Sequence, residues 1–145
     1  MATSYVVLDS GILLATVQNE KLTNTAKSLI YDLGTKNIQF AAPILLRYEV
    51  VAVTRKWVTR QLATEDEAQK ALDILLKFPF ELHFDEALLH RAYQLATQFN
   101  RPTAYDSQYL AVAERLSCDF WTADERLYNS IHAGFSNIKW LGNFA

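Results

Sequence analysis

Four acidic residues, far apart in the sequence, have side chains that could do chemistry together; they are Asp9, Glu49, Asp106 and Asp124. Two of them directly follow short apolar runs, and Glu49 interrupts a long apolar stretch. Carboxylate oxygens are ligands that Mg²⁺ and Mn²⁺ prefer in proteins. One or two such cations can activate water for the hydrolysis of a phosphodiester. If the four carboxylates meet, the sequence therefore predicts a metal-dependent hydrolytic site that needs no nucleophilic side chain.

Three of these acids also have a structural explanation. Asp9 could end a strand in a turn. Asp106 lies three residues after Thr103, so it could complete a capping box at the start of a helix. Asp124 could be a first-turn acid, favoured by the helix dipole, in a helix that Thr122 caps. Taken singly, each structural explanation is at least as good as a catalytic one, and convergence of the acids in space would decide between them.

Glu49 has the weakest structural explanation, because it lies in the middle of an expected helix and not at its end. Burial of an unpaired carboxylate is very costly, so a Glu49 that packs against other elements needs a partner. The partner could be a metal or one of the arginines Arg91, Arg101 and Arg115. The alternative is that Glu49 lies on a solvent-exposed strip of its helix.

A parallel sheet is the arrangement that would bring the four acids together. Short apolar or alternating runs predict strands at residues 5–8, 38–42, 80–84, 119–122 and 138–141. Apolar spacing predicts helices at 23–33, 44–58, 64–76, 85–99 and 104–116, with helical turns at 12–15 and 125–129. Such alternation is typical of an α/β protein with a mostly parallel central sheet, a three-layer α/β/α fold. The carboxyl ends of its strands share one edge, where ligands bind.

Local features of the helices give finer expectations. In the helix at 44–58 we expect the buried face to consist of Leu45, Tyr48, Ala52 and Val53. Gly34 is expected to end the preceding helix, because glycine adopts the left-handed conformation common at helix ends. Thr64 and Glu67 have the spacing of a capping box and predict a helix start there.

Length and composition favour a single domain that covers residues 1–145. Hydrophobic residues make up 50% of the chain, which argues against disorder, and no apolar run is long enough to span a membrane. A net charge of −2 excludes nucleic-acid binding through bulk positive charge, so such a partner needs a local basic patch. Cys118 is the only cysteine, which excludes an internal disulfide and a multi-cysteine zinc site. These features, without a basic leader, lead us to expect a cytoplasmic protein.

The motifs around the acids resemble those of the PIN-domain ribonucleases, and most of all the VapC-type toxins of type II toxin–antitoxin pairs. They are Val6-Val7-Leu8-Asp9-Ser10, Glu49 in its apolar helix, Tyr105-Asp106-x-x-Tyr109-Leu110-Ala111-x-Ala113-Glu114, and Trp121-Thr122-Ala123-Asp124-x-Arg126-Leu127. The resemblance covers essentially the whole chain, and the last two motifs together are the most specific. One departure is Gly11, where many members have a small polar residue; it affects a polar contact there but not the acids.

This resemblance implies a metal-dependent endoribonuclease that cuts single-stranded RNA. It implies that Mg²⁺ or Mn²⁺ is bound by Asp9, Glu49, Asp106 and Asp124. It further implies that Thr122 orients a carboxylate or a metal-bound water, with a similar but lesser part for Ser10. Toxin members commonly form homodimers and are silenced by a cognate antitoxin that covers the active site. The resulting expectations are an RNA substrate, an antitoxin partner, a homodimer and no membrane.

Basic residues that could contact RNA lie in two places. One is a helical flank that contains Arg55, Lys56, Trp57 and Arg60. Aromatic and basic side chains together suit single-stranded RNA, but a solvated helix face with Trp57 in the core or a dimer interface explains this flank better. The other place comprises Arg101 and Arg126, each near a motif acid in sequence. Tyr105 and Tyr109, at i and i+4, are expected to face the core or an interface together.

Two other functions remain open at this point. A catalytically silent PIN-fold module would bind protein or RNA without taking up metal or cutting RNA. A response-regulator-like receiver also clusters acids, but it needs a lysine after a late strand and a phosphoacceptor aspartate. Here Lys139 lies within the last expected strand, and Asp9 is not part of an acidic pair. Labelling by acetyl phosphate would separate a receiver from a nuclease.

Overall fold

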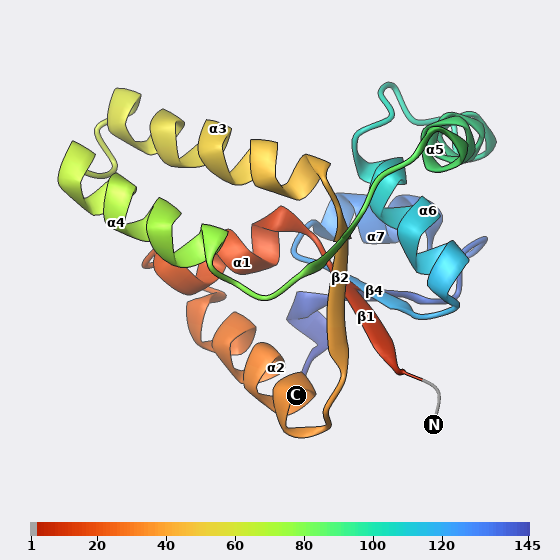
Figure 1. Ribbon diagram of the computed structural model, residues 1–145, viewed down its shortest axis with the longest axis horizontal. Coiled ribbons are helices and arrows are strands. Elements are labelled where there is room, and N and C mark those ends of the chain that lie inside the picture. The colour runs from red at the N-terminus through yellow and green to blue at the C-terminus, as the bar shows by residue number, and fades with distance from the viewer. Residues whose placement is uncertain (1–2) are drawn as a thin grey trace.

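The computed structural model describes residues 3–145, which form a five-stranded sheet with helices packed around it (Figure 1). The strands are β1 (Tyr5–Leu8), β2 (Gln39–Pro43), β3 (Glu81–His83), β4 (Asp119–Thr122) and β5 (Ile138–Trp140). The helices are α1 (Ser10–Val17), α2 (Thr23–Thr35), α3 (Leu45–Thr59), α4 (Glu65–Leu76), α5 (Glu86–Gln98), α6 (Asp106–Leu116) and α7 (Glu125–Ile131), followed by a short 3-10 helix at Leu141–Asn143. The expected α/β class and all five expected strands are confirmed, and every strand pair is parallel.

The strand order is β3-β2-β1-β4-β5. From β1 the chain moves outward through β2 to β3, and then returns to place β4 on the other side of β1. The loops that leave β1 and β4 therefore run to opposite sides of the sheet. Between two such strands lies the topological switch point, where open parallel sheets bind ligands. In this chain the residues at that point are Asp9 and the segment that follows Thr122.

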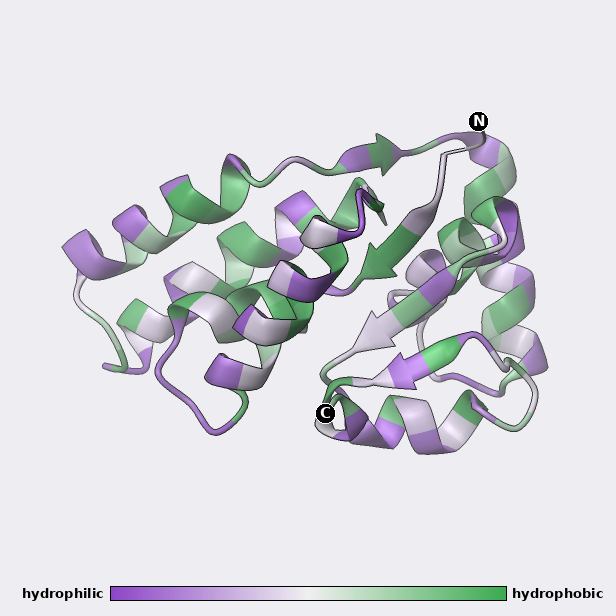
Figure 2. Cartoon of the chain, turned by 90° about the horizontal axis from the view of Figure 1, so that it is seen from below, coloured by the Kyte–Doolittle hydropathy of each residue, from purple (hydrophilic) through white to green (hydrophobic). Residues whose placement is uncertain are grey.

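Both faces of the sheet are covered, as the central strand shows. Side chains of successive strand residues point to opposite faces. Val6 and Leu8 belong to a buried cluster with residues of α1 and α2. Val7 belongs to another, shared with α3, α5, α6 and α7. Figure 2 shows the strands between groups of helices, with hydrophilic segments on some of the strands, and the two buried clusters confirm the expected three-layer arrangement.

Helices α3 and α4 run side by side as a hairpin that extends to the left of the sheet in Figure 1. The buried side chains of α3 are Leu46, Val50, Thr54 and Trp57. The expected buried face is therefore wrong: Tyr48 and Ala52 are exposed, and Leu45 and Val53 are only half-buried. Apolar residues surround much of this helix, so their spacing does not fix which side faces the core.

The end of α2 also differs from the expectation. The helix continues through Gly34 to Thr35, and the residue in the left-handed conformation is Asn37, with φ of 55°. Asparagine tolerates this conformation because its short polar side chain can hydrogen-bond locally. The Thr64–Glu67 capping box at the start of α4 is confirmed. No helix within residues 3–145 is both long enough and apolar enough to cross a membrane.

Candidate active site

Asp9 connects β1, α1 and β4 at the switch point. Its backbone N–H donates to the Trp121 carbonyl at 3.2 Å. Its Oδ1 caps α1 by accepting from the Ile12 N–H at 3.0 Å, and its Oδ2 accepts from the Thr122 hydroxyl at 2.5 Å. Aspartate is favoured at an N-cap because it satisfies a helical N–H that has no partner within the helix. The carboxylate is therefore held in one orientation by both oxygens.

Thr122, the last residue of β4, is fully buried and joins two acids. Its hydroxyl donates to Asp9 and accepts from the Asp124 backbone N–H at 3.0 Å. The expectation that Thr122 caps the following helix is wrong, because Asp124 is the cap. The Asp124 Oδ1 accepts from the Leu127 N–H at 3.1 Å. Thr122 thus fixes the segments that follow β1 and β4 relative to each other.

Glu49 of α3 is half-buried, and its partner is a tyrosine hydroxyl. Tyr109 of α6 is 2% exposed, and its hydroxyl donates to Glu49 Oε1 at 2.5 Å. The Tyr109 ring stacks on Phe120 of β4, with ring centroids 5.7 Å apart and an interplanar angle of 11°. Stacking on a core residue leaves the ring little freedom, so Tyr109 holds the Glu49 carboxylate at a fixed place beside the sheet.

The arginines considered as partners of Glu49 bind other acids instead. The ion pairs are Arg91–Glu114, Arg101–Asp106 and Arg115–Asp85. The expectation of an arginine partner is therefore wrong, and a fully solvated strip is excluded by the half-buried position of Glu49. The Tyr109 partner was missed because the hydroxyl lies 60 residues away in sequence and within an otherwise apolar helix face.

Asp106 begins α6, but it caps nothing there. The N-cap position is Tyr105, which makes no side-chain capping bond, so the capping box suggested by Thr103 and Asp106 does not form. Asp106 is half-buried, and its Oδ2 lies 3.5 Å from Arg101 Nη2. The structural explanation thus fails for Asp106, whereas it holds in part for Asp9 and Asp124, which cap helices.

The four acids, which we call the acid edge, lie at the carboxyl edge of the sheet and affect one another's ionisation. Burial raises the pKa of Asp9 to about 7, and Glu49 contributes further in the same direction. Burial likewise raises the pKa of Glu49, with a smaller contribution from Asp106. Burial also raises the pKa of Asp106; Arg101 opposes this shift and Asp124 adds to it. Each acid thus has another within electrostatic range, and the charged forms of Asp9, Glu49 and Asp106 are held at a cost.

The donor atoms of the acid edge suit a hard divalent cation. They are carboxylate oxygens, with the Thr122 hydroxyl next to Asp9. Mg²⁺ and Mn²⁺ take such ligands, and their charge would offset the repulsion between the acids. In the part of the chain that the structure describes, however, no three acidic, histidine or cysteine side chains already stand close enough together to hold a metal. The acids share an edge without forming a closed set of ligands.

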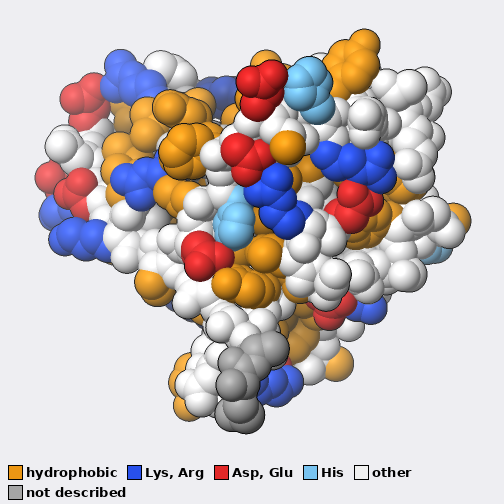
Figure 3. Space-filling view, turned by 45° about the vertical axis from the view of Figure 1, so that its right-hand side comes forward, with side chains coloured by type: hydrophobic (Ala, Val, Ile, Leu, Met, Phe, Trp, Pro, Cys, Tyr) orange, Lys and Arg blue, Asp and Glu red, His pale blue; other side chains and the backbone are white. Residues whose placement is uncertain are grey.

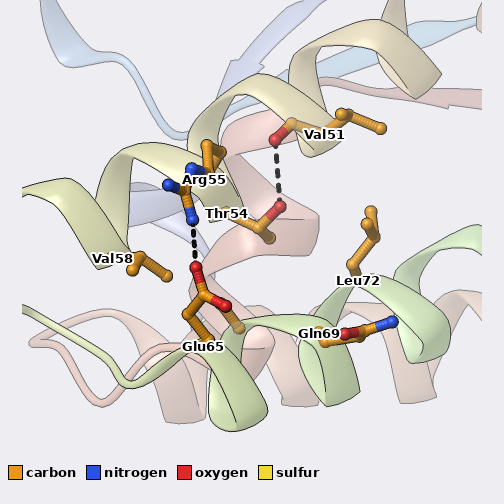
Figure 4. A pocket seen from close by; sticks show the side chains of 8 residues that line it. Val51, Thr54, Arg55, Val58, Glu65, Gln69 and Leu72 are labelled. Carbon is orange, nitrogen blue, oxygen red and sulfur yellow. Dashed lines mark hydrogen bonds and ion pairs between the residues drawn. The ribbon is translucent and has the colours of Figure 1, made fainter.

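A cavity of about 300 Å³ lies elsewhere, between α3 and α4 (Figure 4). Its lining is largely apolar, and three of its polar residues have partners: Thr54 donates to backbone carbonyls, and Arg55 pairs with Glu65 at 2.6 Å. Trp57 is buried and belongs to the core cluster. Of the flank considered for RNA contacts, Arg55 is therefore engaged and Trp57 lies in the core. Figure 3 shows basic and acidic side chains interspersed over another face, without a separate basic patch.

Two exposed tyrosines beside the acids were not expected. Tyr48 precedes Glu49 and is 67% exposed, and Tyr105 precedes Asp106 and is 59% exposed. The expectation that Tyr105 shares the inward face of Tyr109 is wrong, because Tyr105 lies before the first turn of α6. An aromatic residue directly before a candidate acid is the sequence signal that could have drawn attention to Tyr48 and Tyr105 as neighbours of the site.

Comparison with known proteins places these features in a wider context. Residues 6–130 match the PIN domain family. The fold is similar to the crystal structure of PAE2754 from Pyrobaculum aerophilum, with a TM-score of 0.64 and 22% sequence identity, over 98% of this chain and 93% of that chain. No curated protein matches the sequence. At this identity the similarity to PAE2754 shows the fold, while the family match covers most of the chain.

Proposed function

The chain belongs to the PIN domain family, whose members are generally nucleases that use divalent metal ions, and on this premise we propose that it is a Mg²⁺- or Mn²⁺-dependent endoribonuclease. Its substrate would be single-stranded RNA. The observation that carries this proposal is the acid edge at the switch point of the sheet, where Tyr109 and Thr122 hold two of the acids in place. Helix capping gives Asp9 and Asp124 a structural role, but it does not account for Glu49 and Asp106, which are half-buried and cap no helix.

Asp9, Glu49, Asp106 and Asp124 would hold the metal. A divalent cation bound there would activate water and neutralise charge on the phosphate. Thr122 and Tyr109 act as positioning residues, because each donates to a carboxylate oxygen and so fixes the orientation of that carboxylate. The role that the sequence resemblance suggested for Thr122 agrees with this position. A Cβ atom added to Gly11 would lie 3.3 Å from both Ala123 Cβ and Asp9 Oδ1, so a larger residue would crowd the acids.

A water nucleophile suits this chain better than a covalent one. Cys118 is buried, and burial raises the pKa of its thiol to about 11, so little thiolate exists at neutral pH. The thiolate is the reactive form of cysteine. Ser10 begins α1 next to the acids, but no histidine hydrogen-bonds to it in the described residues. This supports hydrolysis by activated water.

We further propose that the protein is the toxin of a toxin–antitoxin pair and acts in the cytoplasm as a homodimer. Two exposed side chains four residues apart on α5, Leu89 and Tyr93, support a protein partner. Neighbouring exposed apolar side chains are typical of surfaces that bind other proteins. Expression of this gene alone should stop growth, and co-expression of an antitoxin from an adjacent open reading frame should restore it.

The direct test is cleavage of single-stranded RNA by the purified protein. Activity should require Mn²⁺ or Mg²⁺, vanish with EDTA and return when the metal is restored. Asp106→Asn should remove cleavage while the circular dichroism spectrum stays that of the wild type. Normal cleavage by this variant, or cleavage that persists in EDTA, would overturn the proposal.

A second candidate is a module of the same fold that binds RNA without cutting it. One observation favours it: within residues 3–145 no three of the acids are close enough to hold a metal, and Arg101 already pairs with Asp106. Under this alternative the wild type binds RNA but shows neither Mn²⁺ uptake nor cleavage. The same assay therefore decides between the two candidates.

A further inference from the structure

Arg101 is placed at the acid edge by the way α5 ends. Asn100 adopts a left-handed conformation with φ of 52°. The Asn100 N–H donates to the Thr97 carbonyl at 3.1 Å, and the Arg101 N–H donates to the Ala96 carbonyl at 2.8 Å. These two bonds form a Schellman motif, which stops the helix at a defined residue. Pro102 follows and restricts the backbone of Arg101, so the point from which this side chain leaves the chain is fixed.

The guanidinium of Arg101 is held near Asp106 but uses few of its donors. The side chain is only 21% exposed, and its contact with Asp106 is long, at 3.5 Å. Its Nε is buried and has no hydrogen-bond partner within residues 3–145. An arginine has five N–H donors, and buried donors are normally satisfied. By contrast, charged atoms are 2.6 Å apart in two other ion pairs, Arg91–Glu114 and Arg115–Asp85.

The negative charge at the acid edge means that a phosphate group needs a nearby cation in order to bind there. Four carboxylates repel a phosphodiester, and the whole protein has a net charge of −2, so the substrate gains no attraction from overall charge. Arg101 is the cation in contact with one of the four acids. Arg126, the other arginine near a motif, is exposed. Guanidinium groups match phosphate geometry with two parallel donors, which a point charge cannot do.

We propose that Arg101 is the phosphate-binding residue of this site, with its guanidinium contacting non-bridging oxygens of the RNA phosphate beside the acids. This inference rests on the proposed function and names one of its substrate contacts. In the metal-free protein one nitrogen of the guanidinium, Nη2, lies 3.5 Å from Asp106 Oδ2. A cation held by Asp106 would offset its charge and would leave this nitrogen of Arg101, with the other donors, for the phosphate. Arg101 thus acts both as a substitute cation and as a substrate ligand.

The first test measures binding of a fluorescein-labelled single-stranded oligouridine by fluorescence anisotropy, in Ca²⁺ and in EDTA. Arg101→Gln should weaken binding in Ca²⁺ about tenfold or more, the effect of one lost hydrogen bond to a charged group. It should also reduce the slope of log affinity against log salt by about one. Arg101→Lys should restore the salt slope but only part of the affinity, because lysine lacks the paired donors.

Arg91→Gln is the matched control, because it also removes one arginine and one ion pair from the region of α5 and α6. This control should bind the oligouridine as the wild type does. Equal affinity of the wild type and Arg101→Gln, or equal weakening by Arg91→Gln, would overturn the inference. Circular dichroism and melting temperature identify a variant that fails to fold. If Arg101→Gln does so, Arg101→Lys decides through its affinity, which should lie below that of the wild type, and wild-type affinity of Arg101→Lys would overturn the inference.

A double-mutant cycle in EDTA separates phosphate binding from simple neutralisation of Asp106. Asp106→Asn should release Arg101 and tighten oligouridine binding in the absence of metal. In an Arg101→Gln background the same change should give a smaller gain, because only the general loss of negative charge remains. An equal gain in both backgrounds would contradict the inference. If the wild type binds RNA but does not cut it, the proposed function fails. The affinities of these variants still test whether Arg101 binds the phosphate.

Discussion

The acid edge and the contact between α5 and α6 use the same residue types in opposite ways. At the helix contact, which we call the helix seam, two acids each receive two hydrogen bonds from one arginine; the pairs are Arg91–Glu114 and Arg115–Asp85. Arginine contacts lower the pKa of Glu114, and they lower that of Asp85 to about 2. At the acid edge, burial raises the pKa of Asp9, Glu49 and Asp106.

This difference shows which charges serve the fold and which are available to a ligand. Acids of the helix seam are matched by cations within the chain, so their charged forms are stabilised. Most acids of the edge have hydroxyl or N–H partners, and Asp106 has one long arginine contact. Perturbed groups that gather at a ligand-binding edge are typical of functional sites. The edge is therefore prepared for a cation that the chain itself does not supply.

The largest expected effect comes from removing a charge at the edge. Asp9→Asn keeps the size of the side chain and should reduce RNA cleavage at least about 100-fold, more than the loss typical for an outer-shell partner. Glu114→Gln, the matched change at the helix seam, should leave the cleavage rate near that of the wild type. Initial rates in Mn²⁺ measure both. Equal losses in the two variants would remove the distinction between edge and seam.

A smaller effect is expected from the hydroxyl that positions Glu49. Tyr109→Phe keeps the ring stacked on Phe120 but removes the donor to the carboxylate. Cleavage should fall about 10- to 100-fold and the apparent Mn²⁺ affinity should fall with it, as for other partners that orient metal ligands. Mn²⁺ titrations followed by cleavage rate test this. An unchanged Mn²⁺ dependence would mean that Glu49 needs no positioning.

Stability against pH should distinguish edge from seam in the metal-free protein. The pKa of Asp9 is raised from 3.8 to about 7 in the folded state. The folded protein therefore binds more protons than the unfolded chain between these values, and its stability falls as pH rises through them. Asp9→Asn should remove this loss, so its melting temperature relative to that of the wild type should rise as pH increases from about 4 to 7 in EDTA, whatever the constant cost of the lost hydrogen bond. A difference in melting temperature that stays constant over this pH range would contradict the raised pKa.

The smallest effect is expected at the seam, and its pH dependence has the opposite sign. The pKa of Asp85 is lowered from 3.8 to about 2 by Arg115 and by capping of α5. Its stabilising contribution is present above the unfolded pKa and disappears as pH falls through the folded one. Arg115→Gln should lower the melting temperature slightly at neutral pH, because exposed ion pairs contribute little. The difference from the wild type should vanish near the lower end of this pH range.

The order of the helices and strands could be predicted from the sequence. The strands Tyr5–Leu8 and Asp119–Thr122, for example, have apolar residues at their centres and are followed by residues that stop strands. The buried face of α3 was not predictable in this way, since Leu46 and Val50 have apolar neighbours on most sides. Three of the site's features depend on contacts between distant residues. The hydroxyls of Tyr109 and Thr122 find their acids only when the sheet is assembled, and Arg101 reaches Asp106 only through the turn after α5.

Diffraction from crystals soaked in saturating Mn²⁺, recorded where manganese scatters anomalously, is the most direct test of the claim that the acid edge holds a divalent cation. We expect an anomalous peak between the carboxylates of Asp9, Glu49, Asp106 and Asp124, and no such peak in crystals of Asp106→Asn. A peak bound to other side chains, or an edge without manganese in the wild type, would contradict the account.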